Sequence, residues 1–279
     1  MQKPHGTPRV ILVILDGLRP DAITPHVMPV LSAVADRGWS TVAHTVRPSV
    51  TVAALTSLAT GVSPARHGLD SERRLPTPAV LGRLAPLPAH LRRHRRRTAI
   101  CTGRLPLYHR LLAGSLLRIA GAGNFFSAGR LPAEVGERAR DHLQRVRPHL
   151  GVVYLNDCDV AGHRDGWMSP SYLEAAHALD GAVGALASLE QEPGTTLLLT
   201  ADHGGGGVAP TDHDAPHPVN DRIPIIAAGA SIAPHVAEDG SARLLDLPPT
   251  ILGLLGVPVP PQYEGRALAL SDQRSAVAA

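Results

Sequence analysis

The stretch VILVILDG, residues 10–17, decides the fold of this 279-residue chain. Six consecutive apolar residues, from Val10 to Leu15, are typical of a strand buried on both faces of a parallel sheet. The run ends in Asp16 and Gly17, a pair typical of the turn that leaves such a strand. We therefore expect an α/β fold with Asp16 at the sheet edge where such folds bind ligands.

The same pattern recurs along the chain. Further strands are expected at 98–102, 151–155, 196–200 and 223–227, and helical spacing of apolar residues is seen at 28–37, 52–60, 133–146, 169–189 and 248–255. This alternation predicts an α/β three-layer sandwich with a mostly parallel central sheet. We expect one domain over residues 1–279, with a small irregular cap within residues 103–131, which fit neither pattern.

Composition fits a globular protein with long loops. The apolar fraction is 44%, and there are 27 glycines and 26 prolines. Cys101 and Cys158 lie in or just after strand-like runs, so we interpret them as free thiols. No signal peptide is recognised and no stretch approaches the roughly 18–20 apolar residues of a membrane span. We expect a cytoplasmic protein with no membrane contact.

A dense basic block lies between His90 and Arg97. Such a block can bind nucleic acid or a membrane surface. We favour a simpler interpretation, the solvated end of a short helix that starts near Pro88 and docks through Leu91. Nucleic-acid binding is therefore disfavoured.

Carboxylate and imidazole side chains follow several of the expected strands. Asp16 follows the first strand, Asp159 and His163 follow a middle strand, and Asp202 and His203 follow a late one; His213 comes after a glycine-rich loop. Each signal is weak alone, because an isolated Asp-His pair is more often a turn or cap. Together they predict a metal site that suits Zn²⁺, with Mn²⁺ or Fe as alternatives.

A hydroxyl lies at the start of an expected helix. The segment RPSVTVAALTSLATG, residues 47–61, reads as a loop that feeds a helix with Thr51 as its N-cap. A metal at that place would lower the pKa of the hydroxyl, and the helix N-terminus would receive a phosphoryl oxygen. Thr51 is therefore a candidate nucleophile as well as a candidate cap.

The chain resembles the alkaline phosphatase superfamily, and within it the type I phosphodiesterase and nucleotide pyrophosphatase branch. The matching pieces run in family order from residue 10 to about residue 260: VILVILDGLRPD, MPVLSAVADRG, RPSVTVAALTSLATGVSPARHGL, YLNDCDVAGHRDG, LLLTADHGGGG, RIPIIAAGASI and LLDLPPTILGLLGVPVP. Each piece is short, but their order makes the set specific.

The resemblance implies two divalent metal ions, with Zn as the preferred metal. One ion would be bound by Asp16, Thr51, Asp202 and His203, and the other by Asp159, His163 and His213, with His217 as the fallback for His213. It also implies that Thr51 attacks phosphorus and forms a phosphothreonine intermediate, which water then cleaves.

The chain departs from the family pattern near the nucleophile. Many nucleotide pyrophosphatases of the family have an asparagine three residues after the nucleophile, where this chain has Ala54. Asn156 or the backbone N–H of Val52 could replace it. The arginine that a monoesterase places near its nucleophile is also missing, unless Arg47 or Arg19 serves.

Phe125 and Phe126 are the best candidates to stack on a nucleobase or an apolar leaving group, although we favour packing within the small core of the cap as their role.

We therefore expect a hydrolase of small phosphate esters or nucleotides, a phosphodiesterase or pyrophosphatase. A phosphomonoesterase and a phosphonoacetate hydrolase-like C–P hydrolase are alternatives, and a non-catalytic binding module belongs to a different class. A sulfatase is disfavoured because residues 51–55 lack a C/S-x-P-x-R frame, and a phosphoglycerate mutase or phosphopentomutase because the chain has no room for their long inserted domain.

Overall fold

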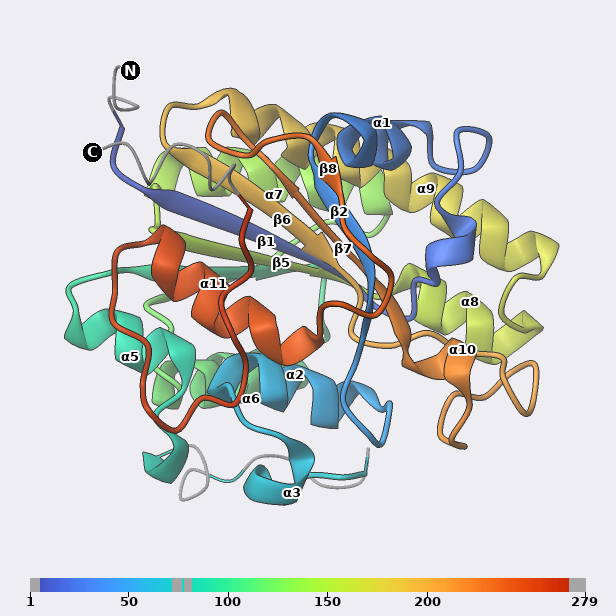
Figure 1. Ribbon diagram of the computed structural model, residues 1–279, viewed down its shortest axis with the longest axis horizontal. Helices are drawn as coiled ribbons and strands as arrows, with labels where there is room; N and C mark the ends of the chain where they lie inside the picture. Colours follow the sequence, from blue (N-terminus) through green and yellow to red (C-terminus); the bar gives the residue numbers. More distant parts are fainter. Residues whose placement is uncertain (1–5, 72–76, 78–81, 271–279) are drawn as a thin grey trace.

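One eight-stranded sheet forms the centre of the molecule (Figure 1). The computed structural model describes residues 6–71, 77 and 82–270. The strands are β1 Arg9–Leu15, β2 Trp39–His44, β3 Thr98–Thr102, β4 Asn124–Ser127, β5 Leu150–Leu155, β6 Thr195–Thr200, β7 Arg222–Ala228 and β8 His235–Val236. Their order is β4-β3-β5-β1-β6-β7-β2-β8. Only β7 runs antiparallel to its neighbours, β6 and β2, so the expected mostly parallel sheet is confirmed.

The central strands are the ones with continuous apolar sequence. All seven residues of β1 and all six of β6 are buried. These strands lie between two layers of helices, so neither face of the sheet reaches water and an uninterrupted apolar run is stable there.

Helices cover both faces of the sheet. They are α1 Pro29–Arg37, α2 Thr51–Thr60, α3 Pro64–His67, α5 Leu87–Arg93, α6 Leu107–Ile119, α7 Pro132–Val146, α8 Asp157–Asp165, α9 Pro170–Ala187, α10 Pro218–Asp221 and α11 Leu247–Leu254. Figure 1 shows α1, α7 and α9 on one face and α2, α5, α6 and α11 on the other. This is the three-layer sandwich predicted from the sequence.

The segment 103–131 is more regular than we expected. It contains α6 and β4, and β4 pairs in parallel with β3 as an edge strand of the main sheet. The expectation of an irregular segment failed because α6 carries apolar residues on several sides and β4 is only four residues long. Neither segment therefore shows the regular spacing of apolar residues by which a helix or a strand is recognised in a sequence.

The basic block, the two cysteines and the helix lengths agree with the sequence. The basic block begins in the last turn of α5 and continues through the turn after it, and α5 docks through the fully buried Leu91 as expected. Cys101 and Cys158 are buried free thiols. Within the described residues, no helix combines the length and apolarity that crossing a bilayer requires.

Candidate metal centre

The carboxyl ends of three adjacent strands bring the predicted side chains together. In the sheet, β1 lies between β5 and β6. Asp16 follows β1, Asp159 and His163 lie one turn apart on α8 after β5, and Asp202 and His203 follow β6. His213 joins them from the loop before α10. We call these six residues, Asp16, Asp159, His163, Asp202, His203 and His213, the Asp–His cluster.

The turn after β1 is held from several sides. The backbone N–H of Gly17 donates to Asp202 Oδ1 at 3.2 Å, and the carbonyl of Gly17 accepts from Trp167 Nε1 and the Tyr172 hydroxyl, both at 2.9 Å. Gly17 has φ +68°, in the left-handed region that favours glycine. The turn therefore fixes both Asp16 and the adjacent Asp202.

Half of the Asp–His cluster surrounds one point deep in the protein. The His203 Nε2 atom lies 3.3 Å from Asp16 Oδ1 and 3.7 Å from Asp202 Oδ2. Thr51 Oγ1 lies 3.1 Å from the same nitrogen. Ligands bound tetrahedrally to one ion at about 2.0–2.1 Å lie roughly 3.3 Å apart, so these spacings fit a shared ion.

The other half is more open. His163 Nε2 lies 3.1 Å from His213 Nε2 and 3.4 Å from Asp159 Oδ1, and its side chain is 47% exposed. His203 Nε2 is farther from Asp159 Oδ1, at 4.0 Å, although Asp159, His203 and His213 can also be grouped as three ligands. The shorter distances favour His163 as the partner of Asp159 and His213.

Backbone carbonyls set the tautomers of all three histidines. His203 Nδ1 lies 2.8 Å from the carbonyl of Gly204, and His213 Nδ1 lies 2.8 Å from that of Ser49. His163 Nδ1 lies 3.0 Å from the carbonyl of Thr211. A carbonyl only accepts, so each Nδ1 carries the hydrogen and each Nε2 directs a lone pair into the cluster. Metal-binding histidines are oriented in this way.

The buried carboxylates provide the second test of a metal fit. Asp16 Oδ1 and Asp202 Oδ2 are buried oxygens without a hydrogen-bond partner. Burial and the nearby carboxylates of Asp202 and Asp159 raise the pKa of Asp16 well above its ordinary value. Burial and the adjacent His203 lower the pKa of His213 to about 4, so its ring is neutral at pH 7. Carboxyl oxygens and neutral imidazoles facing one another are the donor set of a divalent cation.

Sequence reasoning missed one member of this arrangement. The Tyr154 hydroxyl, on β5, donates to Asp16 Oδ2. Burial and Asp16 raise the pKa of Tyr154 well above its ordinary value, so the hydroxyl keeps its proton. A tyrosine within an apolar strand gave no signal of this role, because only the parallel pairing of β1 and β5 brings the two side chains together.

Thr51 is not the N-cap that we expected. The N-cap of α2 is Val50 and Thr51 is the first helical residue, with no side-chain capping bond. The Thr51 hydroxyl is therefore available to the Asp–His cluster, where it donates to His203 Nε2.

The remaining candidates lie at the margin or away from the cluster. Asn156 is exposed at the N-cap of α8, and His217 caps α10 and accepts from the N–H of Val219. Arg47 pairs with Asp221, while Arg19 pairs with Asp21 and donates to the carbonyl of Gly205. These geometries favour His213 over His217.

The two phenylalanines of β4 point to opposite faces of the sheet. Phe126 stacks on His142, with ring centroids 4.3 Å apart, whereas Phe125 faces an apolar cavity on the side of α6. They cannot both contact one ligand, so only Phe125 remains a candidate for substrate contact.

The family model of the type I phosphodiesterases and nucleotide pyrophosphatases matches residues 10–74 and 121–239. The chain belongs to this family. Both matched ranges together contain Thr51 and the whole Asp–His cluster. The family assignment therefore agrees with the resemblance carried by the sequence motifs.

Curated relatives of this family member include phosphoglycerate mutases. The 2,3-bisphosphoglycerate-independent phosphoglycerate mutase 2 of Methanosarcina acetivorans is 32% identical over 142 residues, which cover 50% of this chain and 26% of the mutase. The corresponding mutase of Listeria welshimeri is 32% identical over 135 residues, covering 48% and 26%. The matched part of this chain spans about a quarter of the length of these relatives.

Solved structures share the fold of this family member. An alkaline phosphatase superfamily protein from Vibrio parahaemolyticus superposes with a TM-score of 0.69 at 17% identity, covering 93% of this chain and 69% of the other. The phosphonate monoester hydrolase from Silicibacter pomeroyi gives a TM-score of 0.68 at 17% identity, covering 94% and 76%. The alkaline phosphatase-like fold is thereby confirmed.

Proposed function

We propose that this protein is a metal-dependent hydrolase of phosphate esters, a phosphodiesterase or nucleotide pyrophosphatase, with Thr51 as its nucleophile. The observation that carries the proposal is the contact of the Thr51 hydroxyl with His203, inside a cluster that holds two buried carboxylate oxygens without partners. A threonine that only stabilises the start of a helix would not need a histidine and unpartnered carboxyl oxygens beside its hydroxyl.

Two divalent ions fit the residues of the site. Asp16, Thr51, Asp202 and His203 would hold one, and Asp159, His163 and His213 the other. Zn²⁺ suits this mixture of carboxylates and imidazoles best, with Mn²⁺ or Fe as alternatives. Bound there, the ions would lower the pKa of the nucleophile and neutralise charge on the phosphoryl group.

The protein's own groups position the reacting atoms. Thr51 starts α2, so its hydroxyl lies beside the helix N-terminus, whose N–H groups and dipole favour a phosphoryl oxygen. The Thr51 hydroxyl gives up its proton and its oxygen forms a bond to phosphorus, while the leaving oxygen departs with the bonding pair and, where it is basic enough, takes up a proton from solvent. Water then cleaves the Thr51–phosphate ester and releases the product with Thr51 restored.

The preference for diesters depends on contacts near Thr51. Ala54 is fully buried and has no polar side chain, so it offers no hydrogen bond to a phosphate oxygen. Asn156, exposed at the start of α8, and the backbone N–H of Val52 are the proposed substitutes. A phosphomonoesterase or a C–P hydrolase would use the same metal centre. The substrates that the protein hydrolyses would distinguish these alternatives from a phosphodiesterase.

Hydrolysis of a matched substrate panel tests the proposal. p-Nitrophenyl phosphate, bis-p-nitrophenyl phosphate and p-nitrophenyl thymidine monophosphate are compared with and without Zn²⁺ or Mn²⁺. We expect faster diester turnover that requires metal. Thr51→Ala should lower kcat by at least about a thousandfold, whereas Thr51→Ser keeps a hydroxyl and should retain measurable turnover.

Other results would redirect the assignment. Faster monoester turnover would indicate a phosphatase. Phosphoryl transfer to an added alcohol with little free phosphate would indicate a mutase-like transferase. If none of the substrates is hydrolysed with either metal, the proposed hydrolase activity is wrong and a binding module is favoured.

A further inference from the structure

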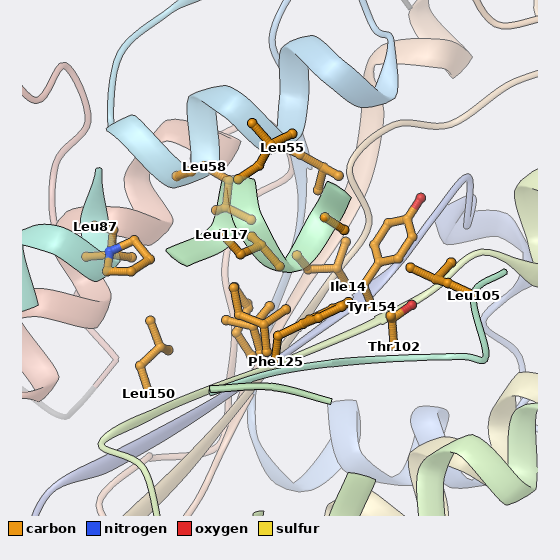
Figure 2. Close-up of a pocket in the computed structure, with 17 residues that line it drawn as sticks. Ile14, Leu55, Leu58, Leu87, Thr102, Leu105, Leu117, Phe125, Leu150 and Tyr154 are labelled. Atoms are coloured by element: carbon orange, nitrogen blue, oxygen red, sulfur yellow. The ribbon is translucent and has the colours of Figure 1, made fainter. Parts of the chain in front are cut away.

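An apolar cavity of about 400 Å³ lies between the sheet and the helices α2, α5 and α6 (Figure 2). Its size is within the range of small-molecule sites. Protein interiors are normally packed without spaces of this size, and water binds poorly where few polar groups are present. The cavity is therefore suited to an apolar ligand.

The sheet side of the cavity has a polar end and an apolar length. At the carboxyl end, Thr102, Tyr154 and Ile14 are aligned across β3, β5 and β1. The next row toward the amino end that faces the cavity is wholly apolar and consists of Ile100, Val152 and Leu12. The lining continues to Leu150, four residues before Tyr154, or roughly 13 Å along the strand.

The polar end meets the Asp–His cluster. Tyr154 lines the cavity, and its hydroxyl donates to Asp16 Oδ2. From the opposite side, the cavity is lined by Leu55, one helical turn after Thr51 on α2. A ligand with its phosphate at Thr51 can therefore extend an apolar group into the cavity.

The helix α6 lines the cavity with Ala113, Leu116 and Leu117. Figure 2 shows Leu117 on the side of the cavity that faces the sheet. None of the residues whose burial is described on α6 is fully buried. Its outer side also carries apolar residues, with Tyr108 72% exposed and Leu111 61% exposed. This wall is thus half-buried and apolar, and it leaves the space beneath it unfilled.

We propose that the cavity binds the hydrocarbon chain of an amphiphilic phosphate ester whose phosphate lies at Thr51. This inference rests on the proposed phosphoesterase function and names its substrate class. The single chemistry required is a phosphate joined to an alkyl chain, because the polar and apolar ends of the site meet at Tyr154.

Chain-length dependence tests the proposal. The metal-loaded enzyme is given alkyl p-nitrophenyl phosphates with methyl, butyl and octyl groups, below their micellar concentrations. p-Nitrophenolate leaves from each, so only the retained alkyl chain differs. We expect kcat/KM to rise by at least about a hundredfold from methyl to octyl, since each buried methylene contributes up to roughly fourfold. A ratio near one would overturn the proposal.

A pair of variants on α6 separates the cavity from the surface. Ala113→Trp would fill the space, whereas Ser115→Trp adds the same ring at an exposed position on the same helix. The octyl-to-methyl ratio should fall at least about tenfold in Ala113→Trp and stay at the wild-type value in Ser115→Trp. Equal ratios in the two variants would contradict the proposal.

Binding distinguishes failure of the cavity from failure of the catalytic assignment. Octylphosphonate and methylphosphonate are titrated calorimetrically into the metal-loaded wild type and Ala113→Trp. If no diester is hydrolysed, tighter binding of octylphosphonate that is weakened in Ala113→Trp would still support the cavity. Equal binding of both phosphonates would overturn it.

Discussion

At the scale of single residues, the geometry around the Asp–His cluster concentrates electron pairs in one place. His163 and His213 bring their Nε2 atoms to 3.1 Å while both Nδ1 atoms face carbonyls. Close to these rings, one buried carboxyl oxygen of Asp16 and one of Asp202 have no hydrogen-bond partner. A bound cation would compensate these facing electron pairs and buried oxygens, and this is the physical basis of the proposed metal centre.

Tyr154 should act through Asp16 rather than on the substrate's phosphorus. Tyr154→Phe removes the hydroxyl that holds Asp16 Oδ2. We expect about 10- to 100-fold weaker metal binding, measured by titration against a competing chelator. Tyr263→Phe is the matched control, because Tyr263 is also largely buried but its hydroxyl has no hydrogen-bond partner. If Tyr154→Phe binds metal as tightly as the wild type, Tyr154 has no such positioning role.

Asp16 should destabilise the metal-free fold as the pH rises. Its folded pKa lies above its unfolded value, so between the two the folded state holds a proton that the unfolded state has released. Stability therefore falls as pH rises through that window. We expect metal-free Asp16→Asn to melt above the wild type at pH 8, by a margin that shrinks toward pH 4, and to lose most of the Tm gain that Zn²⁺ gives the wild type.

Thermal melts from pH 4 to 8, with and without Zn²⁺, check this expectation. The lowered pKa of His213 acts in the opposite sense, since it removes stability as the pH falls from about 6.5 toward 4. That contribution is present in both proteins, so the difference in Tm between them isolates Asp16. A metal-free Asp16→Asn that melts below the wild type at pH 8 would contradict the account.

At the scale of elements, the turn between β1 and the following segment is packed directly against α8. A Cβ at Gly17 would lie 2.9 Å from the Cα of Asp159 and 3.0 Å from its Cβ. The close approach lets α8 pack directly against the turn, with the N–H of Asp159 donating to the carbonyl of Asp16 at 3.1 Å. Both halves of the Asp–His cluster are therefore coupled through this one glycine.

Gly17→Ala should harm both stability and activity. We expect a loss of about 2 kcal/mol or more in the free energy of unfolding, from the positive φ and the contact with Asp159, together with loss of metal-dependent turnover. Gly256→Ala is the matched control, because Gly256 has a similar φ of +65° but open space around it. It should cost about 1 kcal/mol. Urea unfolding that gives equal losses for the two variants would exclude the steric coupling.

At the scale of the whole molecule, the sequence predicted the elements that are buried on both sides. The expected strand at 98–102 matches β3, and the other four expected strands fall within β1, β5, β6 and β7. The strands it missed lie toward the edges of the sheet. In β2 burial alternates with partial exposure, β4 is half-buried throughout, and β8 has two exposed residues. Their sequences therefore lack the continuous apolar run that marks a central strand.

The candidate site was predictable only in part. Asp16, Asp159 and Asp202 were recognisable because each follows a strand or opens the helix after it. The carbonyls that orient the histidines, the Tyr154 contact and the cavity were not, because they depend on which strands are neighbours and on backbone atoms that carry no sequence signature.

Detection of phosphate on Thr51 during turnover tests most directly whether Thr51 is the nucleophile. The metal-loaded enzyme is mixed with bis-p-nitrophenyl phosphate, quenched in acid within the first turnovers and digested for mass spectrometry. We expect a p-nitrophenyl phosphoryl group on the Thr51 peptide that appears and decays with the reaction. Steady release of p-nitrophenolate with Thr51 unmodified at every time point, and equal release by Thr51→Ala, would contradict it.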